Sequence, residues 1–81
     1  MKITYLAKVR KTKDGWYAID FPDLPGTHAQ CATLTEMKPE AEYSLWDYLI
    51  AAQSTGTEVN PPSKSVLATA GDRIIAVTVN I

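Results

Sequence analysis

The sequence predicts an α+β fold with the element order βββαβ, in which one mainly antiparallel sheet carries a single long helix on one face. Two segments near the N-terminus and one at the C-terminus alternate apolar and polar residues, which is the period of a half-buried strand. The segment between them, residues 34–54, repeats its apolar residues at the period of a helix. With 81 residues, 46% of them apolar, residues 1–81 are expected to form a single domain around one core.

The first two strands are predicted as an antiparallel pair over residues 2–10 and 16–21. Between them, Asp14 and Gly15 form a pair that readily supplies the positive φ of a hairpin turn. The residues expected to face the core share odd numbers: Ile3, Tyr5, Ala7, Val9, Tyr17, Ile19 and Phe21.

A rigid corner is predicted where the second strand ends. The segment reads FPDLPG and consists of Phe21, Pro22, Asp23, Leu24, Pro25 and Gly26. Pro22 removes a donor from the sheet, Pro25 presets φ, and Gly26 accepts the positive φ of a type II turn. Residues 27–32 then have room for a short third strand.

The helix is predicted from Thr33, whose spacing to Glu36 fits a capping box, to about residue 54, where Gly56 suits the stop. Pro39 conflicts with an ideal helix, so either the first turn kinks or the regular helix begins at Pro39. The expected core face holds Leu34, Met37, Ala41, Leu45, Tyr48, Leu49 and Ala52. The opposite face holds Glu36, Glu40, Tyr43 and Asp47, a set named here the acidic ridge.

A loop over residues 55–72 and a last strand over residues 73–81 complete the chain. In the loop, Ser63 is expected to cap a brief helical turn through Val66 and Leu67. The last strand is rich in β-branched residues, and its core face is expected to hold Ile75, Val77, Val79 and Ile81.

Charge and composition exclude several classes of protein. The formal net charge of −1 disfavours direct DNA binding by this chain alone, because phosphate-binding proteins need a positive field. A local basic cluster, Lys8, Arg10, Lys11 and Lys13, surrounds the hairpin turn, where solvated charges are ordinary.

The single cysteine, Cys31, allows no internal disulfide and no zinc site. No run is long and apolar enough to span a membrane or direct export, so a cytoplasmic protein is expected.

Five short motifs make the sequence resemble the HicB antitoxin family. They are the DG pair at 14–15, FPDLPG at 21–26, TL at 33–34, YL at 48–49 and PS at 62–63, and together they extend over nearly the whole chain. The sequence departs from the family at Cys31 and Ala32, where relatives commonly have a glycine and an acidic residue, and at Met37-Lys38-Pro39. Many relatives also carry a DNA-binding domain after the last strand. The resemblance therefore implies the toxin-binding module alone, with a partial RNase-H-like fold.

The resemblance also implies the function: an antitoxin that binds and occludes a HicA-type toxin, which is a small RNA-cleaving protein. Such a toxin carries positive charge, so the acidic ridge, Glu36, Glu40, Tyr43 and Asp47, is the candidate partner-binding surface. The alternative for these residues is an ordinary solvated helix face. A stand-alone regulatory or small-molecule-binding domain of the same fold, without a toxin partner, remains the other functional hypothesis.

An enzyme is not predicted. RNase-H-like nucleases place carboxylates around paired metal ions from the first strand onward, and this first strand contains none. Asp20 and Asp23 lie at a strand end and in a turn, and His28 is the only histidine, without a spacing that indicates a triad. We expect no catalytic residue, no metal site and no cofactor.

Self-association is expected through the sheet face that one helix cannot cover. If the odd-numbered residues face the helix, an apolar set points to the other side: Leu6, Trp16, Ala18, Ile74 and Ala76. A homo-oligomer built on this face is the prediction. In the alternative, the loop of residues 55–72 folds over the face, with Val66 and Leu67 as its apolar contact.

Overall fold

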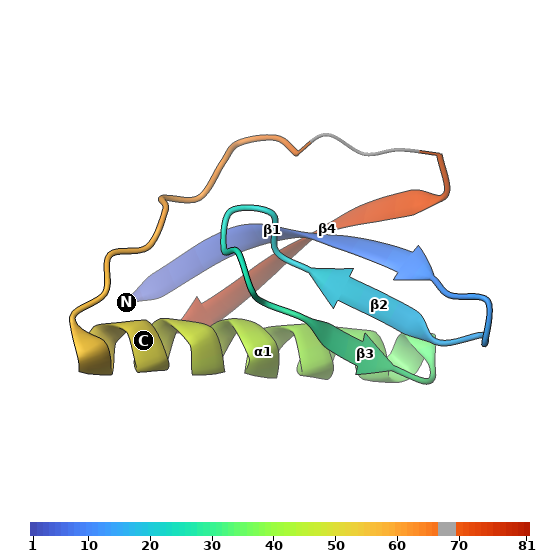
Figure 1. Ribbon diagram of the computed structural model, residues 1–81, viewed down its shortest axis with the longest axis horizontal. Helices are drawn as coiled ribbons and strands as arrows, with labels where there is room; N and C mark the ends of the chain where they lie inside the picture. The colour runs from blue at the N-terminus through green and yellow to red at the C-terminus, as the bar shows by residue number, and fades with distance from the viewer. Residues whose placement is uncertain (67–69) are drawn as a thin grey trace.

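The computed structural model describes residues 1–66 and 70–81, and in them it shows four strands and one helix (Figure 1). The elements are β1 (Lys2–Lys11), β2 (Tyr17–Asp20), β3 (Ala29–Cys31), α1 (Leu34–Thr55) and β4 (Asp72–Asn80). The strands form one antiparallel sheet in the order β3-β2-β1-β4, and α1 lies along one side of it. The predicted α+β class and the βββαβ order are confirmed, with strand ends that differ by one or two residues.

The register confirms the predicted division of the sheet into two faces. Odd-numbered residues of β1, β2 and β4 face the helix and form the core with apolar residues from the corner and the helix. The buried members are Tyr5, Ala7, Val9, Ile19, Phe21, Leu24, Cys31, Ala41, Leu45, Leu49, Val77 and Val79. Ile81 was expected to extend the core face of the last strand, but it lies beyond β4 and is 39% exposed.

Hydrogen bonds explain why the two turns form where the sequence predicts them. In the hairpin, the Thr12 N–H donates to the Trp16 carbonyl at 2.7 Å and Gly15 has φ +85°, so Trp16 belongs to the turn and β2 begins at Tyr17. In the corner, the Leu24 N–H donates to the Phe21 carbonyl and the Thr27 N–H to the Leu24 carbonyl. Gly26, at φ +92°, takes the position that a type II turn reserves for glycine.

Side-chain bonds also shorten the third strand. The Thr27 hydroxyl donates to the Leu24 carbonyl at 2.8 Å and accepts from the Phe21 N–H at 3.2 Å, which holds Thr27 in the corner. The third strand was expected from residue 27, but β3 covers only Ala29–Cys31.

The helix begins and ends at the predicted caps. The Glu36 N–H donates to the Thr33 hydroxyl at 3.3 Å, the hydroxyl donates to the Glu36 carboxylate at 3.0 Å, and Gly56 closes the helix at φ +70°. Pro39 lies inside α1, so the second of the two alternatives, a regular helix that begins only at Pro39, was wrong. Leu34 was expected in the core but is 51% exposed, because an open hollow separates this first residue of α1 from Val9 and Tyr17 of the sheet.

The segment after the helix is fastened to the corner. It runs from the end of α1 to the FPDLPG corner (Figure 1), where the Asp23 carboxylate accepts hydrogen bonds from the Ser63 N–H at 2.8 Å and the Ser63 hydroxyl at 2.6 Å. Asn60 donates to the Asp23 carbonyl and accepts at its own carbonyl from the Tyr5 hydroxyl at 2.6 Å. The helical turn expected after Ser63 does not form up to Val66, and Leu67 lies outside the described residues.

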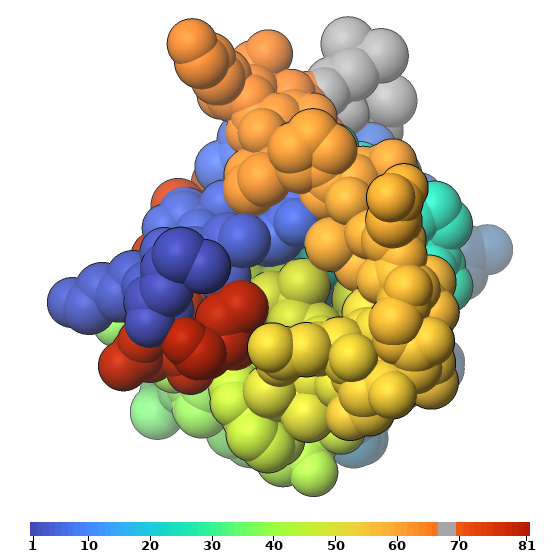
Figure 2. Space-filling model, turned by 90° about the vertical axis from the view of Figure 1, so that its left-hand side faces the viewer, coloured from blue at the N-terminus to red at the C-terminus, as the bar shows by residue number. Residues whose placement is uncertain are grey.

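The two chain ends lie side by side. The Met1 ammonium donates to the Asn80 side chain at 3.0 Å and to the Ile81 carbonyl at 2.8 Å, and the Ile81 N–H donates to the Met1 carbonyl. Figure 2 shows the two ends in contact above the helix.

Candidate partner-binding surface

The structure brings the four residues of the acidic ridge onto one exposed face of α1. Their spacing of four, three and four positions places them along a single line of the helix, and all four are exposed. Tyr43 is 67% exposed and lies between Glu40 and Asp47 along this line. The face is therefore an acidic surface with an aromatic ring near its centre.

The ridge also influences the one cysteine. Burial raises the pKa of the Cys31 thiol, and the carboxylates of Glu36 and Glu40 raise it further. The thiol of Cys31 is buried and therefore stays protonated at neutral pH. A thiol in this state packs as a small apolar side chain and is a poor nucleophile.

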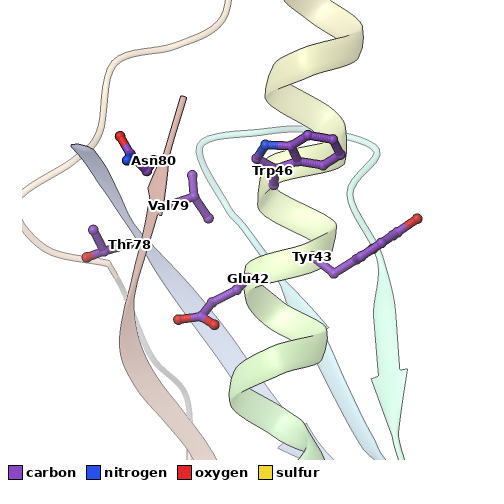
Figure 3. A pocket seen from close by; sticks show the side chains of 6 residues that line it. All are labelled: Glu42, Tyr43, Trp46, Thr78, Val79 and Asn80. Atoms are coloured by element: carbon purple, nitrogen blue, oxygen red, sulfur yellow. The ribbon is translucent and has the colours of Figure 1, made fainter. Parts of the chain in front are cut away.

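A second aromatic surface lies on the flank of α1 next to β4, and the sequence analysis missed it. Trp46 is 42% exposed and borders an open hollow of about 360 Å³ together with Glu42, Tyr43 and residues 78–80 of β4. Figure 3 shows the Glu42 side chain directed toward β4, whereas Tyr43 points away from that strand. Nothing in the periodicity of residues 34–54 indicates which flank of the helix borders a sheet edge.

The outer face of the sheet holds most of the residues predicted for self-association. The register places Leu6 opposite Ala76, Lys8 opposite Ile74 and Arg10 opposite Ala18. Leu6, Ala18 and Ile74 are half-buried, and Ala76 is exposed. Trp16 is 47% exposed in the turn that precedes β2.

The basic residues on this outer face are partly neutralised. The Arg10 guanidinium bonds to the Asp72 carboxylate at 2.8 Å and 3.3 Å, and the Lys8 ammonium lies 4.0 Å from it. The Asp72 side chain is fully covered, although its residue as a whole is half-buried. The hydrogen bond to Asp72, followed by its charge, raises the pKa of Arg10. These contacts neutralise part of the positive charge of the basic cluster around the hairpin turn.

The polar groups considered for catalysis are in structural contacts. His28 Nδ1 lies 3.2 Å from the Asp20 carboxylate, and both side chains are more than half exposed. Asp23 binds Ser63, so it is not directed toward Asp20. Within residues 1–66 and 70–81, no three or more histidine, cysteine, aspartate and glutamate side chains form a group that could hold a metal ion. In the same residues, α1 is too polar to cross a membrane.

Comparison with known proteins gives a consistent family signal. Residues 4–81 match the family model described as the HicB-like antitoxin of bacterial toxin–antitoxin systems. A solved chain from a HicA3 and HicB3 toxin–antitoxin complex is 22% identical, with a TM-score of 0.75, over 93% of this chain and 95% of that chain. The N-terminal domain of the Burkholderia pseudomallei antitoxin HicB is 19% identical, with a TM-score of 0.68, over the full length of both chains. Curated protein sequences gave no significant match.

Proposed function

The chain belongs to the HicB-like antitoxin family, and from this premise we propose that it binds a HicA-type RNA-cleaving toxin and occludes the toxin's RNA-binding face. The fold shared with a chain of a HicA3 and HicB3 toxin–antitoxin complex supports this proposal. The role is binding without catalysis, and we propose that residues 1–81 carry it as one cytoplasmic domain.

The observation that carries the proposed binding site is the exposed Tyr43 within a line of carboxylates. A toxin that holds RNA must present positive charge, and carboxylates on its inhibitor attract that charge and compete with RNA phosphates for it. Glu36, Glu40 and Asp47 are exposed and available for such contacts. A tyrosine covers a large area with few rotatable bonds, so it suits the centre of an interface.

The first experiment asks whether the partner exists. The gene for each adjacent small protein is co-expressed with this chain, and relief of growth arrest and co-purification are scored. Relief together with co-purification supports the antitoxin proposal. If no neighbour arrests growth in a way that this chain relieves, and none co-purifies, the stand-alone regulatory domain becomes the better hypothesis.

The second experiment tests the ridge. The double variant Glu40→Lys with Asp47→Lys leaves the helix cap at Glu36 unchanged, and it should weaken toxin binding at least about tenfold and flatten its salt dependence. The matched control, Asp14→Lys with Glu58→Lys, reverses two exposed acids on other elements and changes the net charge equally. Equal loss of affinity in both variants would show that only net charge matters and that the ridge is not the binding site.

A further inference from the structure

A groove follows the flank of α1 that faces the FPDLPG corner. The chain from this corner to β3 passes alongside the middle of α1 (Figure 1), and an open hollow of about 240 Å³ lies between the two. A second hollow of about 240 Å³ continues toward the end of the helix. Tyr48 and Ala51 border both hollows, so the two form one continuous groove. The first hollow is lined by Gly26, Thr27, His28, Ser44, Asp47, Tyr48 and Ala51.

Small residues keep this groove open. A Cβ on Gly26 would have no neighbouring atom within 4 Å, and the exposed Ala51 places only a methyl group in the groove. Each hollow, at about 240 Å³, is smaller than the roughly 300–1,000 Å³ of typical small-molecule pockets. The groove therefore suits single side chains of a docked protein better than a free small molecule.

The first hollow combines unused acceptor atoms with an aromatic ring. The Asp47 carboxylate and the Ser44 hydroxyl make no hydrogen bond or ion pair with the residues that the structure describes. The two ring nitrogens of His28 lie 3.2 Å and 3.4 Å from side chains of β2 and β3, so neither bonds to Asp47. Tyr48 adds a half-buried ring to the same wall. A carboxylate next to an aromatic ring is a suitable environment for a cation.

We propose that the first hollow binds an arginine side chain of the toxin, with its guanidinium on Asp47 and Tyr48, and that a neighbouring apolar side chain of the toxin fills the second hollow. The identity of the occupant rests on the proposed function, to which the groove adds the type of residue recognised. Arginine fits better than lysine because its planar guanidinium can bond both oxygens of a carboxylate and stack on an aromatic ring.

The second hollow suits an apolar side chain. None of the described residues that line it is charged. The Thr55 hydroxyl lies 3.1 Å from the Ala51 carbonyl and 2.7 Å from the Thr57 hydroxyl, so both threonine hydroxyls already have partners. The groove is thus acidic at Asp47 and uncharged toward Thr55, which matches a toxin segment with a basic residue beside an apolar one.

The groove and the acidic ridge share Asp47. Ser44 lies three positions before Asp47 and Ala51 four positions after it, so the groove opens alongside the ridge. A partner that covers Tyr43 can therefore reach the groove with a neighbouring side chain. Exposed carboxylates attract any cation, whereas a shaped hollow discriminates between arginine and lysine.

Nuclear magnetic resonance of the isolated chain tests this preference without the toxin. The probes are two blocked tripeptides, acetyl-Ala-Arg-Leu-amide and acetyl-Ala-Lys-Leu-amide. We expect the arginine peptide to cause saturable shifts of the Ser44, Tyr48 and Ala51 amide signals, and the lysine peptide to bind at least about fivefold more weakly. Asp47→Asn should abolish this preference, whereas Glu40→Gln, which removes an equal charge outside the hollow, should preserve it. Equal binding of both peptides, or shifts that do not saturate, would overturn the proposal.

Blocking the groove tests whether the toxin uses it. Ala51→Trp places a large side chain where the two hollows meet, so it should weaken binding of the toxin found by co-expression at least about tenfold in calorimetry. The control Gln53→Trp adds the same side chain two positions later, on the opposite side of the helix and outside both hollows, and should leave the affinity unchanged. Circular dichroism checks that both variants are folded.

The two measurements separate the groove from the antitoxin function. A toxin that binds the wild type and Ala51→Trp equally well would overturn the groove and leave the antitoxin function in place. Failure to find any toxin would count against the antitoxin function, and the peptide titration would still decide whether the hollow recognises arginine.

Discussion

The bond between Asp23 and Ser63 connects two of the short motifs, and its strength can be worked out from the geometry. One carboxylate oxygen accepts from the Ser63 N–H at 2.8 Å and the other accepts from the Ser63 hydroxyl at 2.6 Å. The carboxylate thus fastens the segment after the helix to the FPDLPG corner. Asp23→Ala removes both bonds, whereas Ser63→Ala removes only the bond to the hydroxyl.

Hydrogen bonds to a charged group contribute about 1.5–3 kcal/mol each in sheltered positions. Both bonds here are exposed to solvent, so we use a lower contribution of about 1 kcal/mol per bond. Asp23→Ala should then lower the free energy of unfolding by about 2 kcal/mol, and Ser63→Ala by about 1 kcal/mol. For a domain of this size, 1 kcal/mol corresponds to about 4–8 °C in Tm, so the expected decreases in Tm are about 8–16 °C and 4–8 °C.

Chemical and thermal unfolding of the two single variants and the double variant measure this coupling. In the Asp23→Ala background, Ser63→Ala should have almost no further effect, because its partner is already gone. Asp14→Ala, which removes an exposed acid from the hairpin turn, should change stability by less than about 0.5 kcal/mol. Strictly additive effects of Asp23→Ala and Ser63→Ala would refute the proposed clamp.

Three further predictions concern pH, backbone conformation and DNA. Burial raises the pKa of Tyr5 above its ordinary 10.0, and the charge of Asp23 raises it further. The folded state therefore holds the phenol proton more tightly, stability falls as pH rises through the folded pKa, and Tyr5→Phe should reduce this loss in unfolding experiments above about pH 10. A Cβ at Gly26 meets nothing within 4 Å, so Gly26→Ala should cost only the strain of φ +92°, about 1–2 kcal/mol by denaturant unfolding. Because the net charge is −1, the chain alone should give no saturable mobility shift of its upstream DNA at physiological salt, and such a shift would contradict the charge argument.

The fold could be predicted because local signals and periodicity agree along the chain. The hairpin glycine, the corner and both helix caps depend on residues within six positions of one another, so they can be identified in the sequence. The alternation of apolar and polar residues correctly predicted which side chains of β1, β2 and β4 face the helix. Ser63 shows where prediction from neighbouring residues fails. Its partner, Asp23, is 40 positions away, whereas the residues next to Ser63 indicated only that it caps a helical turn.

The candidate surfaces were predictable to different degrees. The acidic ridge follows from helix periodicity alone, so its four residues were correctly expected on one exposed face, while its partner contacts stay a proposal. The surface around Trp46 depends on where α1 crosses the sheet and on β4 being an edge strand. Both facts depend on the order of the strands in the sheet, and the periodicity of the sequence does not predict that order. Leu34 was misassigned for a related reason: it lies on the core-facing side of α1, but an open hollow separates it from the sheet at this end of the helix.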